Sequence, residues 1–169
     1  MDPMNKHAFP DPGHDHSACS GSVLERAERV CARRGARLTA LRRDVLRHLA
    51  QGHQAIGAYE VIARMESEQG PAPAPISIYR ALDFLQAHGL VHKIESRNAY
   101  VACSHGHADE RAVLLICEAC GMVAEMSGGP VFEALDREAA AHGFAPARAV
   151  IELAGRCGHC APIKQVSLP

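Results

Sequence analysis

Four of the seven cysteines form two Cys-x2-Cys pairs, with 36 residues between the pairs: Cys117 with Cys120, and Cys157 with Cys160. A tetrahedral zinc ion accepts four thiolates at about 2.3 Å, and each pair supplies two of them from one tight turn. Gly121 and Gly158 give both turns the backbone freedom that such a turn needs. The gap is longer than in a compact zinc ribbon, so we expect a whole piece of fold to bring the pairs together.

Two other uses of these cysteines are possible: a pair of disulfides, or one redox-active Cys-x-x-Cys. An odd total of seven fits a full disulfide framework poorly. The N-terminus lacks the apolar core of a secretory signal, and no apolar run approaches the roughly 20 residues that span a membrane. We therefore expect a cytoplasmic protein that uses thiolates as metal ligands and has no membrane partner.

A second set of metal-ligating side chains lies between the halves of the chain. Its candidates are one thiol, three imidazoles and one carboxylate: Cys103, His92, His105, His107 and Glu125. Such a mixed site suits zinc, and the thiolate disfavours harder iron or manganese. No HExxH motif and no convincing catalytic group accompanies it, so we expect a protein that is not an enzyme.

The N-terminal half predicts a helical domain that ends in a hairpin. Helical periodicity indicates three helices before residue 66 and a fourth over about 77–88. Strand-like runs follow at 90–95 and 99–103. Short helices followed by a β-hairpin are typical of a winged helix, which places one helix in the major groove of DNA. Residues 22–50 carry eight arginines against three acidic residues, a net +5, which fits a nucleic-acid partner.

The C-terminal half predicts a smaller α/β unit. We expect a hairpin over 112–126 around the first cysteine pair, a helix over 131–142 and a strand over 144–153 that leads to the second pair. The fold class is α+β. The predicted organisation is a flexible His-containing tail (1–21), a winged-helix domain (22–103), a hinge loop with metal ligands (104–111), a dimerisation and zinc-binding domain (112–161) and a short tail (162–169).

Several motifs resemble the ferric uptake regulator family. They are Arg37-Leu38-Thr39, the Tyr-Arg-Ala-Leu-Asp-Phe-Leu run at 79–85 and the two cysteine pairs. The stretch 89–96, with Tyr100 and Cys103 after it, is similar to the zinc uptake regulator branch of that family. The resemblance covers roughly residues 22–161.

The resemblance implies a homodimeric, zinc-responsive repressor that binds an AT-rich palindromic operator in double-stranded DNA and represses zinc-uptake genes. It implies about two Zn²⁺ ions per protomer. The four paired cysteines would hold a structural ion. The regulatory ion would take His92, Cys103, Glu125 and one histidine of the loop, and we prefer His107 to His105 because it lies nearer the next strand.

The same resemblance assigns roles in DNA binding. Tyr79 and Arg80 are expected to contact base edges, with Arg donating to guanine. Arg37, Arg42 and Tyr59 are expected to contact phosphates. Alternatives are an iron- or peroxide-responsive regulator of the same family and, from another class, a thiol oxidoreductase or a zinc-storage protein.

Overall fold

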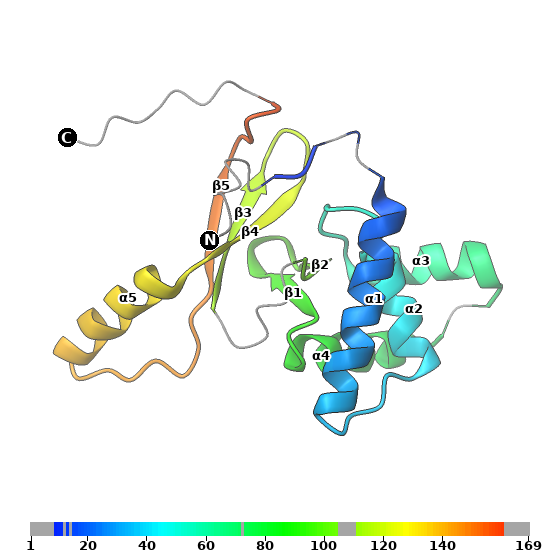
Figure 1. The fold of residues 1–169 in the computed structure, drawn as a ribbon, viewed down its shortest axis with the longest axis horizontal. Helices are drawn as coiled ribbons and strands as arrows, with labels where there is room; N and C mark the ends of the chain where they lie inside the picture. Colours follow the sequence, from blue (N-terminus) through cyan, green and yellow to red (C-terminus); the bar gives the residue numbers. More distant parts are fainter. Residues whose placement is uncertain (1–8, 12, 14, 72, 105–110, 161–169) are drawn as a thin grey trace. The chain divides into compact units, whose positions relative to one another are not determined.

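The computed structural model describes residues 9–11, 13, 15–71, 73–104 and 111–160. The chain divides into two compact units (Figure 1). The N-terminal unit is Asp15–Asp109, and the C-terminal unit is Glu110–Pro169 together with Met1–His14. Among the described residues, none of the helices combines the length and the apolar character that crossing a membrane requires.

Four helices and a two-stranded sheet build the N-terminal unit. The helices are α1 (His16–Arg33), α2 (Ala40–Leu49), α3 (Ala58–Gln69) and α4 (Pro75–Ala87). The strands β1 (Val91–Ile94) and β2 (Ala99–Ala102) pair antiparallel, and the short 3-10 helix η1 (Glu95–Arg97) connects them. Asn98 closes this connection in the left-handed region, with φ of 47°. This order of elements is that of a winged helix, as predicted.

The start of α1 differs from the sequence prediction. We expected a flexible tail through residue 21, but α1 begins at His16, so the prediction is wrong for residues 16–21. The side chain of Asp15 accepts a hydrogen bond from the backbone N–H of Ser17 at 2.8 Å and caps the helix. The hydroxyl of Ser20 donates to the carbonyl of Ala50 at 2.7 Å, which fastens this first turn to the end of α2.

Apolar stripes of all four helices meet in one core. The buried stripe of α1 contains Cys31, which is 2% exposed, and burial raises the pKa of its thiol. Cys31 is therefore a core residue, as the periodicity predicts. Ile56, before α3, forms a bridge with Tyr100 of β2 through two backbone hydrogen bonds of 2.8 and 2.9 Å. This bridge adds a third segment to the hairpin and joins it to the helices.

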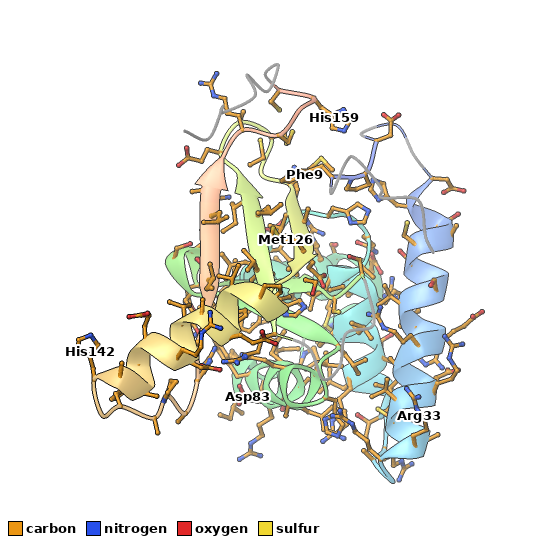
Figure 2. All side chains as sticks on the ribbon, turned by 60° about the vertical axis from the view of Figure 1, so that its left-hand side comes forward. Phe9, Arg33, Asp83, Met126, His142 and His159 are labelled. Atoms are coloured by element: carbon orange, nitrogen blue, oxygen red, sulfur yellow. The ribbon has the colours of Figure 1, made fainter. Side chains whose placement is uncertain are left out.

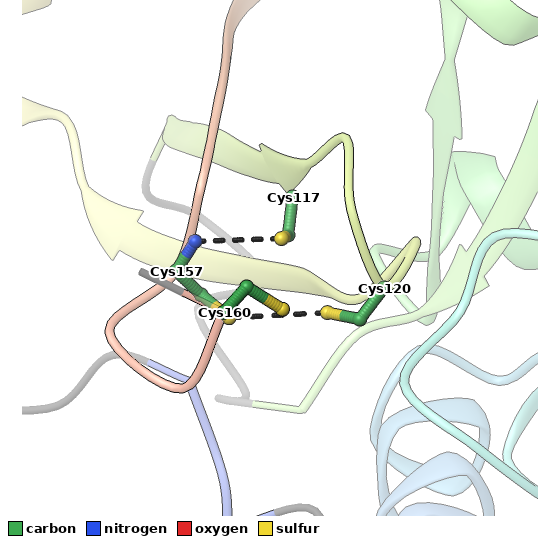
Figure 3. A group of neighbouring side chains, drawn as sticks. All are labelled: Cys117, Cys120, Cys157 and Cys160. Carbon is green, nitrogen blue, oxygen red and sulfur yellow. Dashed lines mark hydrogen bonds between the residues drawn. The ribbon is translucent and has the colours of Figure 1, made fainter. Parts of the chain in front are cut away.

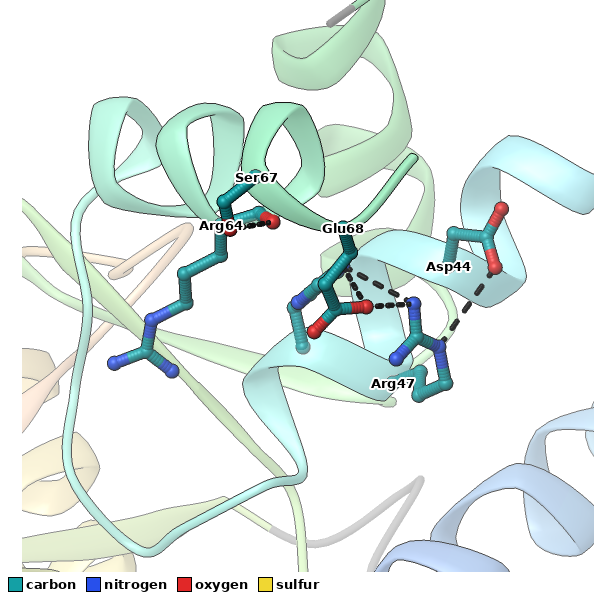
Figure 4. Close-up of polar contacts among 6 residues, drawn as sticks. Asp44, Arg47, Arg64, Ser67 and Glu68 are labelled. Carbon is teal, nitrogen blue, oxygen red and sulfur yellow. Dashed lines mark hydrogen bonds and ion pairs between the residues drawn. The ribbon is translucent and has the colours of Figure 1, made fainter. Parts of the chain in front are cut away.

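A polar cluster holds α2 against α3 around one buried histidine. His48 is fully buried in α2. Arg47 pairs with Glu68 of α3 at 3.0 Å and with Asp44 at 3.8 Å (Figure 4). Burial first, and then the charge of Arg47, lowers the pKa of His48; Glu68 and Asp44 oppose this shift, and Arg64 adds to it. The fold therefore favours the neutral imidazole.

The C-terminal unit is a three-stranded sheet with one helix. Its elements are β3 (Ala112–Cys117), β4 (Val123–Ser127), α5 (Gly129–Ala141) and β5 (Ile151–Gly155). The strand order is β4-β3-β5, in which β3 is antiparallel to β4 and parallel to β5. The last strand is shorter than predicted: residues 144–150 are irregular, because only from Ile151 does the chain pair with β3.

The register of β5 explains how the distant cysteine pairs meet. Cys117 is opposite Gly155 in the parallel ladder, and the N–H of Glu118 donates to the carbonyl of Gly155 at 2.8 Å. Both strands end at this level, so Cys157 follows two residues later beside the turn that contains Cys120. The 36-residue gap contains β4, α5 and β5, the piece of fold that the spacing required.

Candidate metal centres and nucleic-acid interface

The four paired cysteines converge at the end of the C-terminal sheet (Figure 3). Their four sulfur atoms all lie within 4.8 Å of one another. Sγ of Cys120 and Sγ of Cys157 are 3.8 Å apart, well beyond the S–S length of about 2.05 Å in a disulfide. None of the four cysteines forms a disulfide. This spacing matches four ligands around one ion and does not match two disulfides.

Each pair sits in a turn that its own backbone stabilises. The N–H of Gly121 donates to the carbonyl of Cys117 at 2.9 Å, and φ of Gly121 is 75°, which favours glycine. In the second turn the N–H of Cys160 donates to the carbonyl of Cys157 at 3.0 Å. The first pair follows directly from strand β3, which ends at Cys117, so it does not open a helix, the position that activates an oxidoreductase thiol. The geometry is that of two metal-binding turns.

Hydrogen bonding and burial move the pKa values of these thiols in opposite directions. The pKa of Cys117 is lowered to about 6, mainly by the backbone N–H of Cys157, which donates to its sulfur at 3.4 Å. The pKa of Cys160 is raised to about 12, mainly by hydrogen bonding with Cys120. Burial raises the pKa of Cys120 as well. The cluster holds one thiolate easily and resists several, because thiolates at this distance repel each other. A divalent cation removes that repulsion, so this donor set fits zinc.

Two candidate ligands of the mixed site come together in the N-terminal unit. His92 is on β1, opposite Val101 of β2, and Cys103 follows the end of β2. A ring nitrogen of His92 and Sγ of Cys103 lie within 4.8 Å of each other. Cys103 is fully buried and His92 partly buried. The hairpin register thus places one imidazole and one thiol close together. These two groups are half of the predicted ligand set.

The other candidate ligands belong to other segments of the chain. Glu125 is on β4 of the C-terminal unit, opposite Leu114, and is only 7% exposed. A carboxylate at such a position is costly unless it is hydrogen-bonded, paired or bound to a metal. His105 and His107 lie outside the described residues, so the choice between them stays a prediction.

Helix α4 presents one polar face and one buried face. Ile78, Ala81, Leu82 and Leu85 are buried. Arg80 is exposed, as a base-reading side chain requires. Tyr79 is partly buried and packs against the core, so only part of its ring is available to a partner. Ile76, one turn before Arg80 on the same face, is 60% exposed. Sequence reasoning missed Ile76, although its i, i+4 spacing from Arg80 was the available signal.

The residues predicted to contact phosphates differ in how exposed and how firmly held their side chains are. Tyr59 is 71% exposed at the first turn of α3, and Arg37 is exposed just before α2. Arg42 is held more firmly. Its guanidinium donates to the carbonyl of Arg37 at 2.6 Å and lies 3.5 Å from the centre of the Phe84 ring. Phe84 therefore orients Arg42, a role that no sequence motif indicated.

The C-terminal unit exposes apolar side chains on β4, on α5, on β5 and in the segment between α5 and β5. Six large apolar residues of this unit are at least 40% exposed: Met126, Val131, Leu135, Phe144, Val150 and Leu153. Figure 2 labels Met126 on β4 and His142 just beyond the end of α5. These exposed apolar side chains are candidates for an interaction surface.

Comparisons with known proteins agree with this geometry. The model of the ferric uptake regulator family matches residues 33–154. The zinc uptake regulation protein of Escherichia coli (strain K12) is 41% identical over 104 residues, which are 61% of this chain and 60% of that protein. This chain thus spans about 60% of the length of the curated relatives that it matches.

Two solved structures share the fold. One is a zinc uptake regulator complexed with zinc and DNA, with a TM-score of 0.77, 38% identity, and coverage of 83% of this chain and 93% of that chain. The other is the crystal structure of holo XcZur, with a TM-score of 0.76, 40% identity, and coverage of 84% and 99%. The chain belongs to the ferric uptake regulator family and, within it, resembles the zinc uptake regulators.

Proposed function

We propose that this protein is a zinc-responsive transcriptional repressor that acts as a homodimer. The observation that carries the proposal is that the hairpin of a winged-helix unit holds the side chains of His92 and Cys103 close together. A solved relative, 38% identical, is a zinc uptake regulator complexed with zinc and DNA. Localisation in the cytoplasm follows from the same role.

The two sets of thiols have different tasks in this proposal. Cys117, Cys120, Cys157 and Cys160 form a closed site that keeps β3 and β5 together and holds a structural ion. The regulatory ion is bound by His92, Cys103, His107 and Glu125. Because these ligands come from both units, binding the ion restricts how the units can move, and zinc affinity becomes linked to the shape of the dimer.

DNA recognition belongs to the N-terminal unit. Helix α4 enters the major groove, where Arg80 donates to a guanine edge and Ile76 and the exposed part of Tyr79 contact thymine methyl groups. Arg37, Arg42 and Tyr59 contact phosphates and set the position of the unit on DNA. The exposed apolar side chains of the C-terminal unit bury one another in the homodimer, which presents two such units to a palindromic, AT-rich operator.

Fluorescence anisotropy with a labelled AT-rich palindrome tests the proposal. Coupling between two sites is typically worth about 1–3 kcal/mol, so saturating zinc should raise operator affinity roughly 5- to 150-fold over chelator-treated dimer. Equal affinity under both conditions would contradict zinc sensing. A scrambled duplex of the same composition controls for charge-driven binding, which depends on salt and not on sequence.

Metal competition separates this function from the iron- or peroxide-responsive alternative. A thiolate in the regulatory site favours zinc, and a thiolate on redox-active iron invites oxidation. Zinc should therefore activate operator binding at lower free concentration than Fe²⁺ or Mn²⁺. Activation by Fe²⁺ or Mn²⁺ at the lower concentration would assign the protein to the alternative.

A further inference from the structure

An arginine of α1 contacts the backbone of a candidate regulatory ligand. The guanidinium of Arg26 donates a hydrogen bond from Nη2 to the carbonyl oxygen of Cys103, 77 residues away in the chain. On the other side, the N–H of Cys103 donates to the carbonyl of Leu90 at 3.0 Å. The backbone of Cys103 is therefore held at both its N–H and its carbonyl, although the residue lies beyond the last pair of the β1–β2 ladder.

Burying the Arg26 guanidinium for this contact costs more free energy than a purely structural role would explain. Nε of Arg26 is buried and has no hydrogen-bond partner among the described residues. An unsatisfied buried polar group costs about 1–3 kcal/mol. Helix α1 already packs into the core through Val23, Ala27 and Val30, so its position does not depend on this arginine. A structural role alone does not account for keeping a guanidinium at this place.

Holding the carbonyl of Cys103 also directs its side chain. The hydrogen bonds at its N–H and at its carbonyl fix the two peptide planes on either side of Cys103. They thereby fix the direction of its Cα–Cβ bond. This places Sγ within 4.8 Å of a ring nitrogen of His92. Metal ligands must meet their ion to within about 0.2 Å, so a small rotation of this backbone would move the thiolate out of range.

We propose that Arg26 is a positioning residue of the regulatory metal site, which sets the zinc affinity of that site by fixing Cys103 and links this ligand to α1. The proposal rests on the proposed function. Groups that orient metal ligands without touching the ion typically change metal affinity about 10- to 100-fold when they are removed. Arg26 acts on Cys103 through its backbone, so it can be replaced without removing any ligand.

The experiment uses full-length dimer with the structural site loaded with zinc, and adds Co²⁺ or Zn²⁺ to the regulatory site. Arg26→Leu removes the donor, Arg26→Gln shortens it, and Arg26→Lys keeps a charged donor. Arg29→Leu is the matched control, because Arg29 lies on the same helix and its contact is an exposed ion pair with Glu25 at 3.8 Å. Zinc affinity is measured by chelator competition, and thiolate ligation by the thiolate-to-cobalt charge-transfer absorption.

We expect Arg26→Leu and Arg26→Gln to lose about 10- to 100-fold in regulatory zinc affinity, with weakened charge-transfer absorption and the structural zinc retained. Arg26→Lys should recover part of the loss, and Arg29→Leu should match the wild type. If Arg26→Leu fails to fold, Arg26→Gln carries the test.

The role of Arg26 would be overturned if its folded variants kept wild-type zinc affinity and charge-transfer absorption while Cys103→Ser lost both. If Cys103→Ser also kept wild-type zinc binding, the regulatory site itself would be wrong, and the proposed function would fail with it.

Discussion

Replacing Gly128 with alanine should destabilise the C-terminal unit, and by clearly more than the same change at Gly129. Gly128 precedes α5, and its N–H donates to the carbonyl of Arg111 at 3.0 Å. A Cβ at this position would lie 2.5 and 2.6 Å from two ring carbons of Phe132 and 2.8 Å from the carbonyl oxygen of Arg111. At Gly129, apart from the chain neighbours and the backbone of α5 itself, no heavy atom of the described residues lies within 4 Å of the added Cβ.

The magnitude follows from these distances. Carbon atoms pack at about 3.5–4.0 Å, so the ring of Phe132 would have to move by about 1 Å. The ring is 1% exposed and the carbonyl belongs to the backbone, so neither can turn into solvent. Overpacking of this kind costs about 1–3 kcal/mol. At Gly129 the gain of about 0.4–1 kcal/mol from restricting the unfolded chain is opposed by Pro130, which disfavours a helical alanine before it, so Gly129→Ala should cost clearly less than Gly128→Ala.

Urea unfolding of the zinc-loaded dimer, followed by circular dichroism, measures both effects. Protein and zinc concentrations are kept equal across variants, because both ligand and partner subunit add to apparent stability. Gly128→Ala should lower the midpoint, and Gly129→Ala should lower it much less or not at all. Equal shifts in the two variants, or no loss in Gly128→Ala, would refute the packing that we describe around Phe132.

Three further predictions concern the buried His48, the DNA-binding helix and the dimer surface. The fold lowers the pKa of buried His48, so below about pH 6.5 the unfolded chain takes up a proton that the folded chain does not. The free energy of unfolding should therefore fall by up to about 1.4 kcal/mol per pH unit as the pH is lowered. His48→Gln should remove this contribution from urea midpoints measured between about pH 7.5 and 5.5. Arg80→Met should lower operator affinity by about 1–3 kcal/mol, roughly 5- to 150-fold, in anisotropy titrations that leave scrambled DNA much less affected; an equal loss on both duplexes would speak against base reading. Leu153→Glu, which places a charge on the exposed apolar surface, should shift sedimentation from dimer to monomer, and a fully dimeric variant would move the interface elsewhere.

The elements that position the candidate sites could be predicted well from local signals. The apolar spacing of Ile78, Leu82 and Leu85 predicts a helix near the residues that form α4. The zinc turns follow from two short cysteine spacings. The same reasoning placed Cys31 in the core, where it is buried.

Other features depend on contacts between distant residues and could not be predicted. The first turn of α1 forms because Asp15 caps it and Ser20 bonds to Ala50, and neither contact has a strong local signature. The strand predicted over 144–153 begins only at Ile151, because pairing with β3, and not local β-propensity, decides where it starts. The hydrogen bond from Arg26 to the carbonyl of Cys103 joins residues 77 positions apart, so periodicity and spacing cannot reveal it.

Operator affinity of the Cys103→Ser variant, measured across free zinc concentrations beside the wild type, tests the division between structural and regulatory zinc most directly. We predict that wild-type affinity rises roughly 5- to 150-fold with zinc. The variant should stay a folded dimer with about one zinc per protomer, held by the four paired cysteines, and should bind the operator weakly at every zinc concentration. A variant that responds to zinc like the wild type would contradict our account of how this protein senses the metal.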